Sequence, residues 1–246
     1  MTDVRTSRPA PTRGQRGAAW AVHAYTATGS VFALLFLLAG VDGHLRSAFG
    51  WAVAAMVVDG SDGTLARRAD VKRVVPEFEG ALLDNVVDFL TYVFAPVVVL
   101  QQNGFLPRGD AGLVVAALPL LASCYQFCRT DAKTDDHLFL GFPSYWNVVA
   151  FYAVVLDLSR TATAITVVVC AVLVFVPIGY LYPSRATAFQ RSSLALGVLW
   201  AVVATVLLVQ LPDVNRTLAL LSLLYVVHYV VVSLELTRRR RAARTA

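Results

Sequence analysis

The chain has 246 residues, of which 57% are hydrophobic and only 15% are charged, and its mean hydropathy is +0.64. Soluble domains are about 45–50% apolar and about 25% charged, so this composition excludes an ordinary soluble domain. A net charge of +5 would favour a nucleic-acid partner in a polar chain, but in a chain this apolar it favours membrane lipids, and we expect no nucleic acid.

Eight apolar runs are long enough to be considered as crossings of a hydrocarbon layer about 30 Å thick. They cover residues 20–41, 46–66, 81–103, 111–129, 143–158, 161–182, 194–211 and 217–236. The fifth run is the shortest and includes polar and aromatic side chains, so its ends are the least defined. The pattern predicts an all-α, polytopic integral membrane protein with about eight transmembrane helices.

The eight runs form one transmembrane domain, residues 20–236. The segment 1–19 before it has four arginines among prolines and glycines, and the segment 237–246 after it has five arginines. We expect the first segment to be a disordered basic tail and the second to be a basic tail in the cytoplasm, where it attracts anionic headgroups.

Basic residues divide unevenly between the two sides that eight crossings create. With the N-terminus inside, the inner segments hold seventeen of the 21 Lys and Arg residues. The four outer connections hold one arginine each: Arg46, Arg108, Arg160 and Arg216. Cytoplasmic loops hold the excess of basic residues in membrane proteins. We therefore expect both termini and any inner-side site to face the cytoplasm, in the plasma (inner) membrane.

Four aspartates stand at the inner ends of the second and third runs, where charged side chains are costly. Asp59 and Asp62 are three residues apart, and Asp84 and Asp88 are four apart, so each pair lies on one side of a helix. The connection 67–79 is short, which makes the two helices antiparallel neighbours. Carboxylate oxygens between them suit Mg²⁺ or Mn²⁺, and two such ions can promote displacement at phosphorus. Ion pairs with basic residues of the connection are the alternative, but they require no such pattern.

The same region resembles the signature of the CDP-alcohol phosphatidyltransferases. That signature is D-x-x-D-G-x-x-A-R followed by G-x-x-x-D-x-x-x-D, and the chain reads DGSDGTLAR from residue 59 and GALLDNVVD from residue 80. The twelve residues between the two halves are more than most members of the family have. The long spacer, together with WAVHAYTATG near the N-terminus and VPIGYLYPSR at the end of the sixth run, is similar to the branch of the family that uses choline.

The resemblance implies a six-helix core and a reaction in which CDP-diacylglycerol and choline give phosphatidylcholine and CMP. It also implies that two Mg²⁺ or Mn²⁺ ions are bound by Asp59, Asp62, Asp84 and Asp88, and that the protein is a homodimer. Asp88 is then the candidate general base for the choline hydroxyl, which attacks the β-phosphorus.

Further residues are candidates for binding the two substrates. For CDP-diacylglycerol they are Asp59, Gly63, Ala66, Arg67, Gly80, Arg129 and Lys133. Choline offers only a hydroxyl and a quaternary ammonium, so its site should present aromatic faces. The candidates there are Tyr92, Tyr25, Tyr145 and Trp146, of which Tyr92 continues the spacing of Asp84 and Asp88.

Two alternatives remain open from the sequence. The first keeps the chemistry but uses another alcohol: inositol, inositol phosphate, serine or glycerol phosphate. The second is a cation or proton transporter with carboxylates along its pathway. Transporters of that kind tend to place such groups near the midplane on several broken helices, whereas this chain collects them at one end of two helices.

Overall fold

The structure is a computed structural model, and it describes residues 10–132, 134, 138–181 and 190–245. Helices make up nearly all of it, as the sequence predicts. Their order, with one π-helical turn (η1) and two short strands, is α1 (Arg13–Val41), α2 (Leu45–Arg68), α3 (Val71–Val74), α4 (Gly80–Asp88), η1 (Phe89–Phe94), α5 (Ala95–Gln102), α6 (Asp110–Cys128), β1 (Leu138–Leu140), α7 (Trp146–Val155), α8 (Arg160–Phe175), β2 (Gly179–Leu181), α9 (Gln190–Gln210) and α10 (Arg216–Thr245). The strands β1 and β2 pair antiparallel, which the sequence did not predict.

Each of the eight predicted crossings overlaps a helix. Among the described residues, five helices are long and apolar enough to cross a membrane: α1, the continuous helix α4–η1–α5, α6, α9 and α10. The helix α2 is 24 residues long but carries the polar motif, and the apolar helices α7 and α8 are shorter. The chain is therefore an integral membrane protein with several crossings.

Three helix ends differ from the predicted limits. The helix α1 starts at Arg13, inside the tail expected to be disordered, because Thr12 and Gln15 form a capping box there. The helix α8 stops at Phe175, well before residue 182, since Pro177 cannot continue a helix. The helix α10 runs on through the expected C-terminal tail to Thr245.

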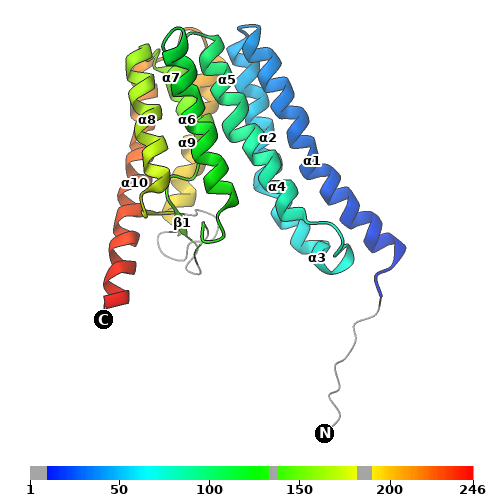
Figure 1. The fold of residues 1–246 in the computed structure, drawn as a ribbon. Helices are drawn as coiled ribbons and strands as arrows, with labels where there is room; N and C mark the ends of the chain where they lie inside the picture. The colour runs from blue at the N-terminus through cyan, green and yellow to red at the C-terminus, as the bar shows by residue number, and fades with distance from the viewer. Residues whose placement is uncertain (1–9, 133, 135–137, 182–189, 246) are drawn as a thin grey trace.

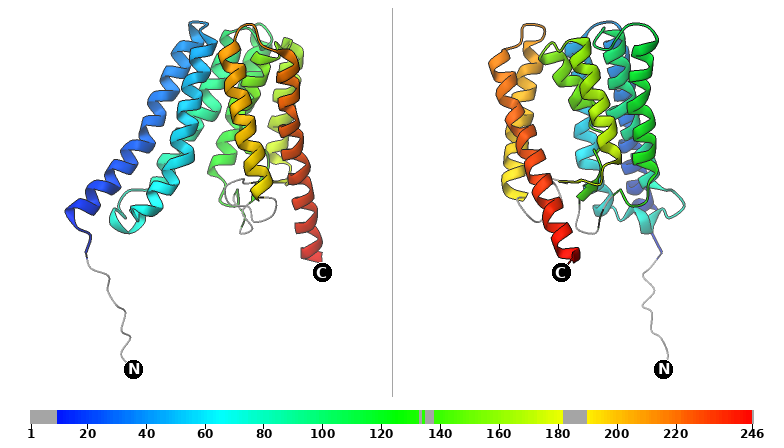
Figure 2. Two further views of the ribbon diagram at one scale, coloured as in Figure 1. Left: turned by 180° about the vertical axis from the view of Figure 1, so that it is seen from behind. Right: turned by 60° about the vertical axis from the view of Figure 1, so that its left-hand side comes forward.

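The helices alternate in direction, so their ends gather into two groups. The start of α1 and the end of α10 lie at one end of the bundle together with α3 and β1, and we call this the motif end (Figure 1). The connections α1–α2, α5–α6, α7–α8 and α9–α10 lie at the other end, the far end (Figure 2). The far end is thus the one to which the predicted outer connections belong. Toward the motif end, α1, α2 and α4 diverge from α6, α8 and α10 (Figure 1).

Glycines allow α1 to pack closely on the α4–η1–α5 helix. A methyl group at Gly29 would overlap Val87, and one at Gly40 would overlap Val99. Without side chains at these two positions, the helix backbones can approach each other, as small residues permit in membrane helices. The close packing holds α4, which carries half of the motif, in a fixed position beside α1.

Candidate active site

The two halves of the motif face each other from neighbouring helices. Asp59 lies in the last three turns of α2, and Asp84 and Asp88 lie on α4. Between the helices the chain reverses through Asp70, which adopts a left-handed conformation (φ 49°), and through the short helix α3. Val71, Val74 and Val75 of this connection pack on Ala19 of α1, which anchors the connection against the bundle.

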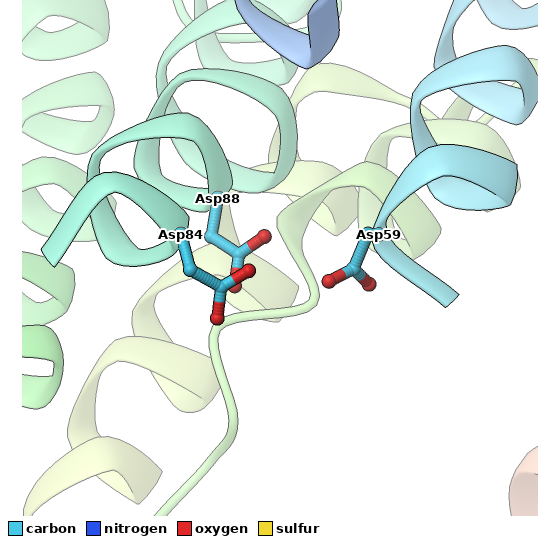
Figure 3. Close-up of side chains that lie close together, drawn as sticks. All are labelled: Asp59, Asp84 and Asp88. Atoms are coloured by element: carbon cyan, nitrogen blue, oxygen red, sulfur yellow. The ribbon is translucent and has the colours of Figure 1, made fainter. Parts of the chain in front are cut away.

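Three carboxylates meet at the motif end. One carboxylate oxygen from each of Asp59, Asp84 and Asp88 lies within 4.8 Å of the other two, and all three residues are partly buried. Figure 3 shows Asp84 and Asp88 projecting side by side from α4 toward Asp59 on α2. Three like charges this close repel one another unless a cation lies among them. An all-oxygen donor set of this kind fits a hard divalent cation such as Mg²⁺ or Mn²⁺.

Asp62, the fourth predicted ligand, does not belong to this group of three. Its side chain is buried, and it accepts a hydrogen bond of 2.8 Å from the Thr26 hydroxyl on α1. A separation of three residues turns a side chain by about 60° around the helix axis. Asp59 therefore points toward α4 while Asp62 points toward α1. Thr26 is a site residue that the sequence analysis did not select.

Tyr92 lies directly beside the carboxylates. Its hydroxyl donates a hydrogen bond of 2.7 Å to Oδ2 of Asp59. Tyr92 belongs to the π-helical turn η1, which starts immediately after Asp88, and such turns occur frequently at functional sites. The side chain predicted to contact choline thus also holds one of the predicted metal ligands.

A pocket of about 690 Å³ opens between α1, α2, α4 and the connection that includes α3. This is a size typical of small-molecule sites. The predicted nucleotide-binding residues Gly63, Ala66, Arg67 and Gly80 all line it. Asp84 lines it too and also belongs to the group of three carboxylates, so the pocket and the carboxylates form one continuous site.

The two glycines of the pocket lie against different side chains. A methyl group at Gly63 would be in ordinary contact, at 3.4 Å, with the guanidinium of Arg67, so the Arg67 side chain lies beside this glycine. A methyl group at Gly80 would lie 2.8 Å from Cε1 of His23 on α1. Gly80 therefore accommodates a protein side chain, and His23 is a second pocket residue that the sequence analysis did not select.

Arg129, one of the two basic candidates from the loop after α6, is not among the described residues that line this pocket. The guanidinium of Arg129 forms two hydrogen bonds, of 2.6 and 2.7 Å, with the carboxylate of Asp131. This hydrogen bonding lowers the pKa of Asp131 below its ordinary value. Lys133 lies outside the described residues.

Four tyrosines form a row that leads away from the carboxylates. The ring centroids are 6.2 Å apart for Tyr92 and Tyr145, 6.3 Å for Tyr145 and Tyr229, and 6.1 Å for Tyr229 and Tyr180. The row joins η1, the start of α7, α10 and β2. Tyr229 and Tyr180 were not predicted, and no short-range pattern could have indicated them because they come from distant parts of the chain.

The other two aromatic candidates lie elsewhere. Trp146 is 1% exposed, and its indole N–H donates a hydrogen bond of 2.8 Å to Ser123, so it belongs to the core. Tyr25 forms a hydrogen bond of 2.8 Å with the Ser61 hydroxyl between α1 and α2. Neither makes a ring contact with the row of four tyrosines in the described structure.

Comparison with known proteins identifies several similar chains, although no family model matches. The chain is 42% identical over 194 residues to a phosphatidylcholine synthase of Pseudomonas aeruginosa, covering 79% of this chain and 81% of the relative. It is 38% identical over 234 residues to that of Legionella pneumophila, covering 92% and 91%. The corresponding protein of Borreliella burgdorferi is 34% identical over 181 residues, covering 74% and 77%.

Proposed function

The chain belongs to the phosphatidylcholine synthase family, and from this premise we propose how its motif end carries out the reaction. It is an integral membrane enzyme that transfers the phosphatidyl group of CDP-diacylglycerol to choline, giving phosphatidylcholine and CMP. The predicted family and acceptor are confirmed. The alternatives of another alcohol and of a cation or proton transporter are thereby set aside.

We propose that Asp59, Asp84 and Asp88 bind divalent metal, and this group of three carboxylates is the observation that carries the mechanism. Two Mg²⁺ or Mn²⁺ ions are the number and type that the family resemblance implies. Bound there, they would stabilise negative charge on the pyrophosphate and on the departing CMP. Asp62 remains a predicted ligand, and its hydrogen bond from Thr26 fixes its carboxylate in the wall of the pocket.

Asp88 is the proposed general base. The choline oxygen forms a new bond to the β-phosphorus, the bond from that phosphorus to the bridging oxygen breaks, and CMP leaves with the electron pair. The hydroxyl proton of choline passes to a carboxylate oxygen of Asp88. Asp88 is suited to this because it stands at the junction of α4 and η1, one turn from Tyr92 and the row of tyrosines.

The two substrates would approach Asp88 from different sides. The pocket lined by Gly63, Ala66 and Arg67 would hold the CMP part of CDP-diacylglycerol, with the Arg67 guanidinium available for a phosphate. The row formed by Tyr92, Tyr145, Tyr229 and Tyr180 would receive choline. Aromatic faces attract a quaternary ammonium, and the hydrogen bond from Tyr92 to Asp59 joins the two halves of the site.

We also propose the orientation and the assembly. The division of basic residues favours a motif end that faces the cytoplasm of a bacterial inner membrane. The homodimer rests on the family resemblance alone.

Incorporation of labelled choline into lipid tests the function. Membranes that contain the protein, supplied with CDP-diacylglycerol and Mn²⁺ or Mg²⁺, should form labelled phosphatidylcholine and release CMP in equal amounts. Chelation of divalent ions should stop the reaction, and their return should restore it.

A matched pair of variants tests the metal site. Asp59→Asn should lose activity and bind less Mn²⁺ in a direct binding measurement on the purified protein. Asp110→Asn, at the far end of the bundle, should retain both properties. Equal Mn²⁺ binding by both variants would contradict the assignment of the metal ligands.

A further inference from the structure

His23 has a buried nitrogen without a hydrogen-bond partner among the described residues. The residue is 5% exposed, and the unpartnered atom is Nε2. Most buried polar atoms in proteins are hydrogen-bonded, since burying one without a partner is costly. The imidazole lines the 690 Å³ pocket, so the missing partner can come from a ligand bound there.

Aromatic rings surround the imidazole of His23. Its centroid lies 4.5 Å from that of Phe78 and 5.9 Å from that of Trp20, and the last two rings are 5.2 Å apart. Phe78 also lines the pocket, whereas Trp20 is 46% exposed. These rings give this part of the pocket flat aromatic faces, which suit a planar heterocycle, because nucleobases stack on aromatic and histidine rings. Glu79, the residue between Phe78 and Gly80, lines the same pocket.

The pocket also has charged lining residues. Arg67 and Lys72 are its basic lining residues, and Asp84 leads to the group of three carboxylates. Phosphates are bound by basic side chains and by metal ions, so the pyrophosphate belongs on that side. The aromatic part around His23 is then left for the base of the nucleotide.

The packing of α1 on α4 holds the imidazole in place. Gly80 lies against Cε1 of His23, where a methyl group would be only 2.8 Å away. Three residues further along α1, Thr26 donates its hydrogen bond to Asp62. The same side of α1 therefore presents His23 to the aromatic part of the pocket and Thr26 to Asp62 of the motif.

We propose that His23 is a specificity-determining residue whose Nε2 hydrogen-bonds the cytosine of CDP-diacylglycerol, with Phe78 beside the base. This inference rests on the proposed function. Cytosine presents both donors and acceptors on one edge, and a neutral imidazole can supply the complementary group in either tautomer. A pocket that hydrogen-bonds its ligand in this way discriminates against ligands that lack the matching group.

The test compares His23→Phe with His23→Gln. Phenylalanine retains a flat ring but has no nitrogen, whereas glutamine retains a donor and an acceptor. In His23→Phe we expect the inhibition constant of CMP and the KM for CDP-diacylglycerol to rise by about tenfold, as the loss of one buried hydrogen bond would cause, while the KM for choline stays unchanged. The preference for CMP over UMP as inhibitor should fall, and His23→Gln should recover part of it.

His228 provides the matched control because it is a second histidine in an apolar helix but has a partner, the Ser193 hydroxyl at 3.3 Å. His228→Phe should leave CMP inhibition as in the wild type. Thermal unfolding of each variant in detergent establishes that it is folded.

Two results would overturn the role of His23, and they are distinguishable from failure of the proposed function. A folded His23→Phe enzyme that CMP inhibits as strongly as the wild type would show that Nε2 does not contact the nucleotide. If inhibition by CMP and inhibition by UMP weakened equally in His23→Phe, His23 would not discriminate between the two bases. If wild-type membranes formed no phosphatidylcholine from choline, the proposed function and the inference would both fail.

Discussion

The two ends of the helix bundle differ in what some of their arginine side chains contact. At the far end, arginines join the connections to one another: Arg160 donates a hydrogen bond of 2.9 Å to the Gly104 carbonyl, and Arg46 donates one to the Leu211 carbonyl. At the motif end, Arg67 is hydrogen-bonded to Thr64 of its own helix and also lines a pocket. Polar groups that bind other parts of the chain stabilise the fold, whereas those that face a pocket are available to a ligand.

The largest effect should come from the proposed base. Asp88→Asn preserves the shape of the side chain but cannot accept the choline proton, so kcat should fall by about a thousandfold, within the range known for general bases. Single-turnover measurements with CDP-diacylglycerol would measure this decrease in rate. Retention of near-normal CMP release would contradict the assignment.

A smaller effect is expected at Thr26, which lies outside the group of three carboxylates. Thr26→Val removes the hydrogen bond to the buried Asp62 carboxylate, and hydrogen bonds to charged groups contribute about 1.5–3 kcal/mol, so kcat/KM for CDP-diacylglycerol should fall by at least about tenfold. Thr26→Ser keeps the hydroxyl and is the control. Loss of activity in both variants would instead indicate a packing role for the threonine methyl group.

Tyr92 separates the contributions of a ring and a hydroxyl. Tyr92→Leu removes the aromatic face and should raise the KM for choline by about tenfold, far more than that for CDP-diacylglycerol. Tyr92→Phe keeps the face and loses only the hydrogen bond to Asp59, so the KM for choline should stay near the wild-type value while kcat falls. If Tyr92→Leu changed both KM values equally, the residue would serve packing alone.

The smallest effect on activity should come from the far end. Arg160→Ala removes a hydrogen bond between two connections and should lower stability by about 1 kcal/mol, or about 2–4 °C in Tm. The activity per folded molecule should not change. A loss of activity larger than the loss of folded protein would show that the two ends are not independent.

The group of three carboxylates could be predicted because the information is local in the sequence. Asp84 and Asp88 are one helical turn apart, and a short connection brings their helix against the one that carries Asp59. The position of Asp62 could not be predicted in the same way. Its spacing from Asp59 allows it to face either α4 or α1, and the packing of α1 decides the direction.

The row of tyrosines and the role of His23 depend on contacts between distant segments. Tyr92, Tyr145 and Tyr229 are more than fifty residues apart in sequence, and only the packing of η1, α7 and α10 brings them together. His23 is one of several polar residues in an apolar helix, and a histidine in such a helix usually packs in the core rather than binding a ligand. Its unpartnered nitrogen becomes visible only when the neighbours of the imidazole are known.

The π-helical turn η1 determines how the site residues before it and the packing residues after it are oriented relative to each other on one continuous helix. The carboxylates of α4 precede it, and Val99, which packs on Gly40 of α1, follows it. Each residue of an α-helix turns the chain by about 100°. Deleting one residue within η1 to leave a regular α-helix would therefore rotate Val99 away from Gly40 or Asp88 away from Asp59. The π-helical turn changes the angular position of all residues that follow it. One helix can therefore direct its carboxylates toward α2 and Val99 toward α1, which a uniform α-helix of the same sequence could not do.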